Sequence, residues 1–105
     1  MADSTKLTIP DKRLDYVIHY MKLEDVVEAV PEEKDIVATL CMATMIYLQG
    51  APVLETEENA DLYWFLVGVM VLHAYDHRDE VGFVPPGVRP VFNQLKLQTD
   101  YAESE

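Results

Sequence analysis

The pattern of apolar and polar positions along the chain predicts helices. Pro10 and Asp11 favour a helix start, and the apolar residues that follow at helical spacing are Leu14, Val17, Ile18 and Met21. This spacing predicts a first helix over residues 11–22. The segment 22–30 is ambiguous, and residues 25–29 are compatible with a second, short turn of helix.

A longer helix is predicted over residues 31–49. Pro31, Glu32 and Glu33 mark its start, because acidic side chains are favoured in the first turn, and Gly50 marks its end. Two neighbouring apolar stripes follow, one of Ile36, Leu40, Ala43 and Tyr47 and one of Val37, Cys41, Met45 and Leu48. So wide an apolar face predicts that this helix is central in the fold.

The third predicted helix begins near residues 57–61 and contains an unbroken apolar run, residues 62–72. The run is shorter than the ~20 residues that a membrane span needs, so it indicates a buried helix. Being apolar on every side, it must be covered on every side. Either a neighbouring copy of the protein completes this cover, or the second helix and the C-terminal segment suffice. Gly68 within the run predicts a close helix crossing.

The C-terminal part begins with a stiff turn at Pro85, Pro86 and Gly87, which ends regular structure. Residues 88–97 then predict a short helix docked on the core. The polar residues 98–105 predict a flexible acidic tail. The fold class expected is therefore all-α, a single domain over residues 1–97 built as a small bundle of three main helices plus a short C-terminal helix.

Charge and composition limit the possible partners. The 105 residues include 8 Lys and Arg against 19 Asp and Glu, a net charge of −11, and half of the residues are hydrophobic. Such an acidic chain disfavours binding to DNA and to anionic membranes. The charge either keeps a sticky protein soluble or forms a surface along which nucleic acid slides without adhering. This large hydrophobic fraction suggests that a partner covers part of the apolar surface.

The sequence offers little for catalysis, and we expect no enzyme activity and no cofactor. The serines, Ser4 and Ser104, lie in the two tails. Cys41 lies in an apolar stretch, which raises the pKa of a thiol and lowers its reactivity. As the single cysteine, Cys41 also excludes an internal disulfide. No glycine-rich phosphate loop is present. The first six residues lack the apolar stretch of a signal peptide.

One constellation deserves comparison with a metal site. His73 and His77, four residues apart, share a helix face, and His19 or an acid would have to supply a third ligand. The alternative interpretation places His73 at the edge of the core. The remaining charged positions, Asp76, His77, Arg78, Asp79 and Glu80, then form a solvated or inter-subunit charge cluster. We favour this second interpretation and predict no metal.

The stretch of residues 62–96 resembles the head–tail connector (adaptor) proteins of long-tailed bacteriophages. The resemblance rests on an apolar helix that closes on His73-Ala-Tyr75-Asp-His-Arg78-Asp79, similar to the family's His-x-Tyr-x-x-Arg-Glu string, followed by Pro85-Pro86-Gly87-Val88 and a short apolar segment. Upstream, residues 35–50 with Tyr47 match the family's second helix. The N-terminal segment around His19 and the loop 51–58 depart from the family pattern.

The resemblance implies a structural virion protein at the head–tail interface, assembled in the host cytoplasm. Its copies would form a ring that joins the portal of the DNA-filled capsid to a stopper or tail-completion protein, with DNA passing through unbound. The candidate residues for the subunit interface are Tyr63, Trp64, Tyr75, Asp76, Arg78, Asp79 and Glu80. Those for the portal contact are Phe92, Leu95, Lys96, Leu97 and Tyr101. The alternative function is a small acidic helical regulator, such as an inhibitor or antitoxin-like binding module.

Overall fold

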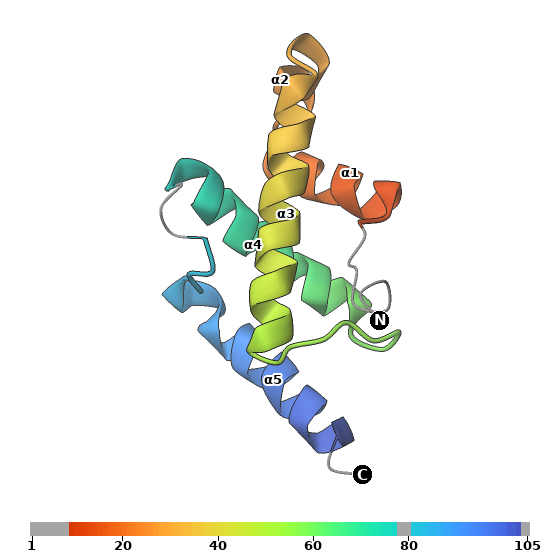
Figure 1. The fold of residues 1–105 in the computed structure, drawn as a ribbon, viewed down its shortest axis with the longest axis vertical. Helices are drawn as coiled ribbons and strands as arrows, with labels where there is room; N and C mark the ends of the chain where they lie inside the picture. The colour runs from red at the N-terminus through yellow and green to blue at the C-terminus, as the bar shows by residue number, and fades with distance from the viewer. Residues whose placement is uncertain (1–8, 78–80, 104–105) are drawn as a thin grey trace.

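In the part of the chain that the structure describes, five α-helices and one short 3₁₀-helix follow one another (Figure 1). The structure, a computed structural model, describes residues 9–77 and 81–103, with side chains described as far as residue 98, and these residues contain no strand. The elements are α1 (Asp11–Tyr20), α2 (Glu24–Ala29), α3 (Glu32–Gly50), α4 (Ala60–Asp76), the 3₁₀-helix η3 (Pro86–Val88) and α5 (Arg89–Glu103). The all-α prediction is confirmed.

Local chemistry explains where α1 stops. Lys22 adopts a left-handed conformation with φ 59°, and the backbone N–H groups of Lys22 and Leu23 bond back to His19 and Ile18. These two bonds form the Schellman arrangement that ends a helix, in which the left-handed position is usually a glycine. With lysine at that position, the sequence pattern extended the predicted helix to residue 22, whereas α1 ends at Tyr20.

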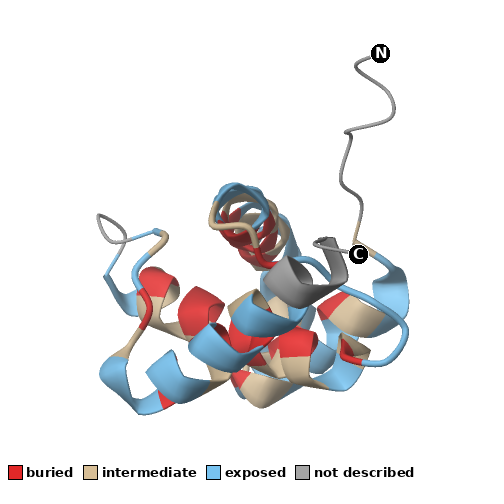
Figure 2. Cartoon of the chain, turned by 90° about the horizontal axis from the view of Figure 1, so that it is seen from below, coloured by how far each residue is buried: buried red, intermediate tan, exposed pale blue. Residues whose placement is uncertain are grey.

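The central helix of the fold is α4, which packs against α1, α3 and α5. Its buried residues are Tyr63, Trp64, Leu66, Val67, Gly68, Met70, Val71 and Ala74. By contrast, α3 crosses α4 on one side only, and its outer side is open, as Figure 2 shows. The prediction of a central α3 is supported by its packing against α1, α2 and α4 and by its buried residues, although its outer side is open. Its uncharged outer face is uncovered in the single chain.

The C-terminal helix docks on the core through its first half. Phe92 and Leu95 are buried, and Leu97 is 69% exposed. The helix continues to Glu103, beyond the end predicted near residue 97, so the segment 98–103 that was expected as a flexible tail is helical in backbone. The molecule measures 48 × 34 × 25 Å, with α2 and the start of α3 at one end and the end of α5 at the other (Figure 1).

Candidate functional site

The thiol of Cys41 is buried in the core and is not a candidate nucleophile. Burial raises its pKa to about 12, so it stays protonated at neutral pH. The two serines lie outside the described residues. Cys41 is therefore not placed for covalent catalysis.

His73 and His77 form a stacked pair at the end of α4. Their ring centroids lie 4.5 Å apart with planes 28° from parallel, and Phe83 also stacks on His73, at 4.7 Å. A zinc ion must lie about 2 Å from each ligand nitrogen and near the plane of each ring, which two nearly parallel stacked rings do not allow. Within residues 9–77 and 81–103, no group of three or more His, Cys, Asp and Glu side chains is placed to hold a metal ion. The geometry favours His73 as a half-buried polar group.

Three candidates for the subunit interface are engaged within the chain itself. Trp64 is fully buried, and its indole N–H donates to Oε2 of Glu55 at 2.9 Å. Tyr63 is 4% exposed, and the hydroxyl of Tyr75 donates to Oε1 of Glu33 on α3 at 2.7 Å. Tyr63 and Trp64 leave almost no surface for a second copy in this conformation.

The rest of the predicted charge cluster divides between described and undescribed positions. Asp76 is exposed at the end of α4. Arg78, Asp79 and Glu80 lie outside the described residues, so their role stays a prediction.

The five candidate portal contacts have different surroundings on α5. Phe92 and Leu95 are buried against the core, Lys96 is half-buried, and Leu97 is the most exposed of the large apolar side chains that the structure describes. The side chain of Tyr101 lies outside the described ones. Lys96 and Leu97 are therefore the described candidates with surface available to a partner.

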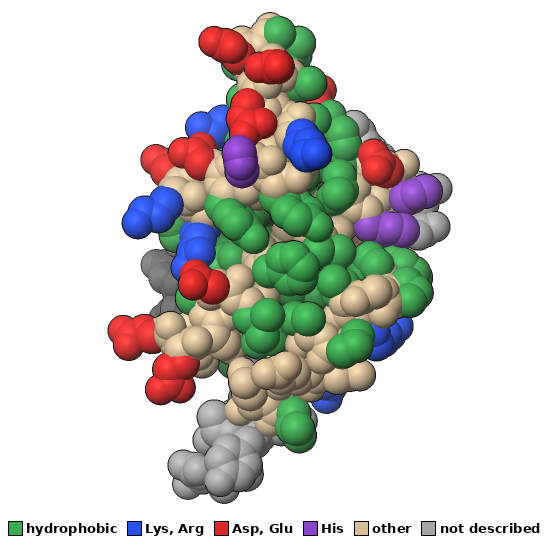
Figure 3. Space-filling view, turned by 180° about the vertical axis from the view of Figure 1, so that it is seen from behind, with side chains coloured by type: hydrophobic (Ala, Val, Ile, Leu, Met, Phe, Trp, Pro, Cys, Tyr) green, Lys and Arg blue, Asp and Glu red, His purple; other side chains and the backbone are tan. Residues whose placement is uncertain are grey.

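One uncovered apolar surface, which we call the α1–α4 face, lies on the side of α4 that points away from α3. It consists of Tyr16, Tyr20, Leu62, Phe65, Val69 and Leu72, all half-buried except Tyr16, which is 37% exposed. The four α4 residues follow at helical spacing along one side of the helix. Figure 3 shows apolar side chains gathered in the middle of this side of the molecule.

Ring packing joins α1 to α4 within this face. The rings of Tyr20 and Phe65 meet edge to face with centroids 6.1 Å apart. A Cβ added to Gly68 would lie 3.4 Å from the Tyr20 ring, so the predicted close crossing at Gly68 is confirmed. Arg13 extends the same side of α1 and pairs with Asp61 at 3.4 Å. Tyr16 stands between Arg13 and Tyr20 on α1, and therefore on the same side.

The second uncovered surface, which we call the α3 face, runs along the outer side of α3. It consists of Thr39, Ala43, Ile46 and Gly50, which follow at helical spacing, and Ile46 is 58% exposed. No charged residue occurs between Asp35 and Glu55. Sequence reasoning missed this face because an uncharged helix was interpreted as buried within the chain.

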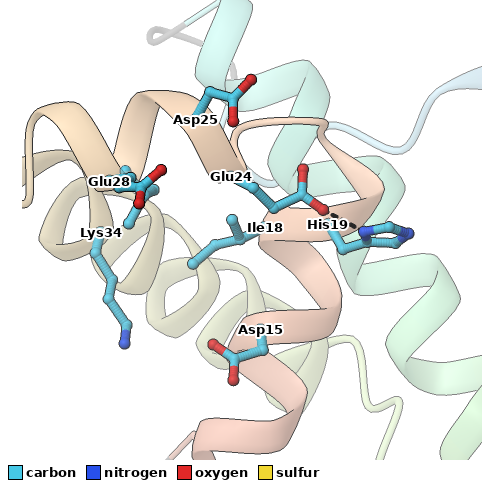
Figure 4. Close-up of a pocket in the computed structure, with 8 residues that line it drawn as sticks. Asp15, Ile18, His19, Glu24, Asp25, Glu28 and Lys34 are labelled. Carbon is cyan, nitrogen blue, oxygen red and sulfur yellow. Dashed lines mark hydrogen bonds and ion pairs between the residues drawn. The ribbon is translucent and has the colours of Figure 1, made fainter.

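A shallow groove of about 580 Å³ lies where α1, α2 and the start of α3 meet (Figure 4). The residues that line it are Asp15, Ile18, His19, Glu24, Asp25, Val27, Glu28 and Lys34. A hydrogen bond joins Nδ1 of His19 to Oε2 of Glu24 and is the main reason that the pKa of Glu24 is lowered. The other carboxylates lie at separate points of the rim (Figure 4). The groove is acidic and open, and it has no convergent set of ligands.

No family model, no curated protein and no solved structure matches the chain. No helix in the described ranges is long and apolar enough to cross a membrane.

Proposed function

We propose that this protein is the subunit of a ring at the head–tail interface of a long-tailed bacteriophage. The ring joins the portal of the DNA-filled capsid to a stopper or tail-completion protein, and DNA passes through its channel. The sequence resemblance over residues 62–96 suggests this role. One structural observation supports it: the α3 face and the α1–α4 face lie uncovered on opposite sides of one chain.

Two uncovered faces on opposite sides favour repeated association. A pair related by a two-fold axis uses the same patch on both copies, and therefore covers one face and leaves the other open. Head-to-tail association covers both faces, and it gives a ring where the rotation between copies closes. A regulator that acts as a monomer or dimer gives no reason for the second face.

The acidic character of the chain supports passage of DNA without adhesion. Proteins bind the phosphate backbone chiefly through Lys and Arg, which displace counterions. This chain carries a net charge of −11, and its Lys and Arg residues are dispersed along the sequence. A channel built from such subunits repels the DNA backbone instead of holding it.

The test is assembly on the portal ring of the phage that encodes the protein. We expect the purified chain to bind that portal complex and to form a ring on it, visible by negative-stain microscopy and countable by native mass spectrometry. Leu97→Asp at the exposed part of α5 should weaken binding to the portal without unfolding the chain. A wild-type chain that neither binds the portal nor self-associates at high concentration contradicts the proposal.

A further inference from the structure

We propose that His19 and Glu24 form a pH-sensitive latch that holds α2 against the end of α1. The latch is stronger while His19 carries a proton and weaker once that proton is lost. The proposal does not depend on the proposed function. Three features of the described residues support it: the weak anchoring of α2, the hydrogen bond that joins it to α1, and the charges around that bond.

The helix α2 is weakly anchored in the fold. None of its six residues is buried. It packs against α3, and its contacts with the core come from half-buried Val27 and from Leu23 just before its first turn. The left-handed turn at Lys22 precedes it, and Pro31 follows it. A short segment with so few apolar contacts opens more easily than the core does.

A hydrogen bond ties this helix to α1. Nδ1 of His19, in the last turn of α1, bonds to Oε2 of Glu24, the first residue of α2 (Figure 4). A charged imidazole makes the bond about twice as strong as a neutral one does. Histidine is the side chain whose charge ordinarily changes between about pH 5 and about pH 8. The same bond lowers the pKa of Glu24, so the carboxylate stays charged throughout this range and the latch weakens as the pH rises.

The other charged groups around the latch lie farther from it. The groove is also lined by Asp15 of α1, by Asp25 and Glu28 of α2, and by Lys34 of α3, while Lys22 lies in the turn between α1 and α2. In the described part of the chain, none of these side chains forms an ion pair with His19 or Glu24. A proton on His19 adds a positive charge to a groove that carries four carboxylates and one ammonium. The added charge is attracted on balance, and most closely by Glu24.

The effect should appear in the opening of α2 and not in the stability of the whole fold. The side chains of His19 and Glu24 are 80% and 52% exposed, and exposed pairs of this kind change an equilibrium only a few-fold. Such a change is small beside the core, but it is visible in a segment that opens by itself.

Hydrogen exchange of backbone N–H groups in α2 tests the latch. The N–H of Val27 donates to the carbonyl of Leu23. The N–H of Val30 donates to the carbonyl of Val26, so both bonds break when α2 opens. Exchange of the full-length chain is measured by NMR at about pH 5.5 and about pH 8, and each rate is divided by that of an unfolded chain at the same pH. We expect about two- to fivefold greater protection at the lower pH, without the same change in α4.

Two variants remove the latch from either side. His19→Gln keeps a polar side chain that takes up no proton, and Glu24→Gln removes the carboxylate. Each should lower the protection of α2 at about pH 5.5 to the value that the wild type has at about pH 8. The matched control is His77→Gln, which removes the exposed histidine at the end of α4 and should leave the pH dependence of α2 unchanged. Wild-type protection that does not change with pH, an equal change in α4, or a pH dependence that survives in His19→Gln would overturn the proposal.

Discussion

The substitution Ile46→Glu tests whether the α3 face takes part in assembly. Ile46 is 58% exposed in the single chain, so more than half of its surface remains to be buried by a neighbour. Complete burial of an isoleucine contributes about 1.5–3 kcal/mol, so this remainder contributes about 1–2 kcal/mol to each seam, the interface between two copies. Burying an unpaired polar group there adds a cost of about 1–3 kcal/mol. The seam should therefore weaken by about 3 kcal/mol, which is about a hundredfold in the dissociation constant.

The same substitution should leave the isolated chain folded. An exposed helical position away from the core usually changes the free energy of unfolding by less than about 0.5 kcal/mol. We therefore expect a melting temperature within about 4 °C of wild type, since about 1 kcal/mol corresponds to ~4–8 °C in a domain of this size. Circular dichroism measures the melting, and sedimentation velocity over a concentration series, with and without portal, measures assembly.

Val26→Glu supplies the matched control for this experiment. Val26 is a partly exposed apolar residue on α2, 38% exposed and outside both faces. It should change neither melting nor assembly. An Ile46→Glu chain that assembles like wild type would refute the reasoning, because a carboxylate cannot enter an apolar seam without loss. A large drop in melting temperature would show instead that Ile46 supports the fold.

Three further outcomes concern the core. The buried hydroxyl of Thr44 has no hydrogen-bond partner among the described residues. Thr44→Val should therefore raise the free energy of unfolding, measured by urea titration, by about 1–2 kcal/mol. Thr44→Ser keeps the hydroxyl and should give no gain. In Gly68→Ala, the added Cβ lies 3.4 Å from the Tyr20 ring, and the free energy of unfolding should rise by up to ~1 kcal/mol through helix propensity. Gly68→Leu should lower the free energy of unfolding by ~1–3 kcal/mol, because the larger side chain does not fit the crossing. Equal melting temperatures for the two variants would contradict the close crossing. Burial raises the pKa of both Cys41 and Tyr63 to about 12, from 9.0 and 10.0. The unfolded chain therefore loses these protons first, stability falls from about pH 9 to about pH 12, and Cys41→Ala should make that decline shallower.

Helix starts were predictable because they depend on a few local residues. Pro10 with Asp11 and Pro31 with Glu32 mark the beginnings of α1 and α3 in both the sequence and the structure. Helix ends were less predictable. A lysine in the left-handed position ends α1, and the polar last turns of α5 carry no apolar periodicity that could announce them.

The placement of α3 and α4 was harder to predict for a different reason. An uncharged segment indicates how much apolar surface must be buried, but it does not indicate which element or which neighbouring molecule buries that surface. The sequence therefore predicted both a central α3 and a buried α4, but it did not predict that the outer side of α3 stays open while α4 is enclosed by α1, α3 and α5. For the same reason Trp64 was assigned to a seam, whereas its partner is Glu55 of its own chain.

Stacking two helices with long uncharged segments explains why the uncovered faces are opposite. Because α3 crosses α4, the side of α3 farthest from α4 and the side of α4 farthest from α3 point in opposite directions (Figure 1). The chain has α1 and α5 to cover the flanks of α4, but no described element covers either outer side fully. In a head-to-tail ring each copy has two neighbours, so both outer sides can be covered at once. The apolar surface that the fold leaves uncovered would then hold the copies together.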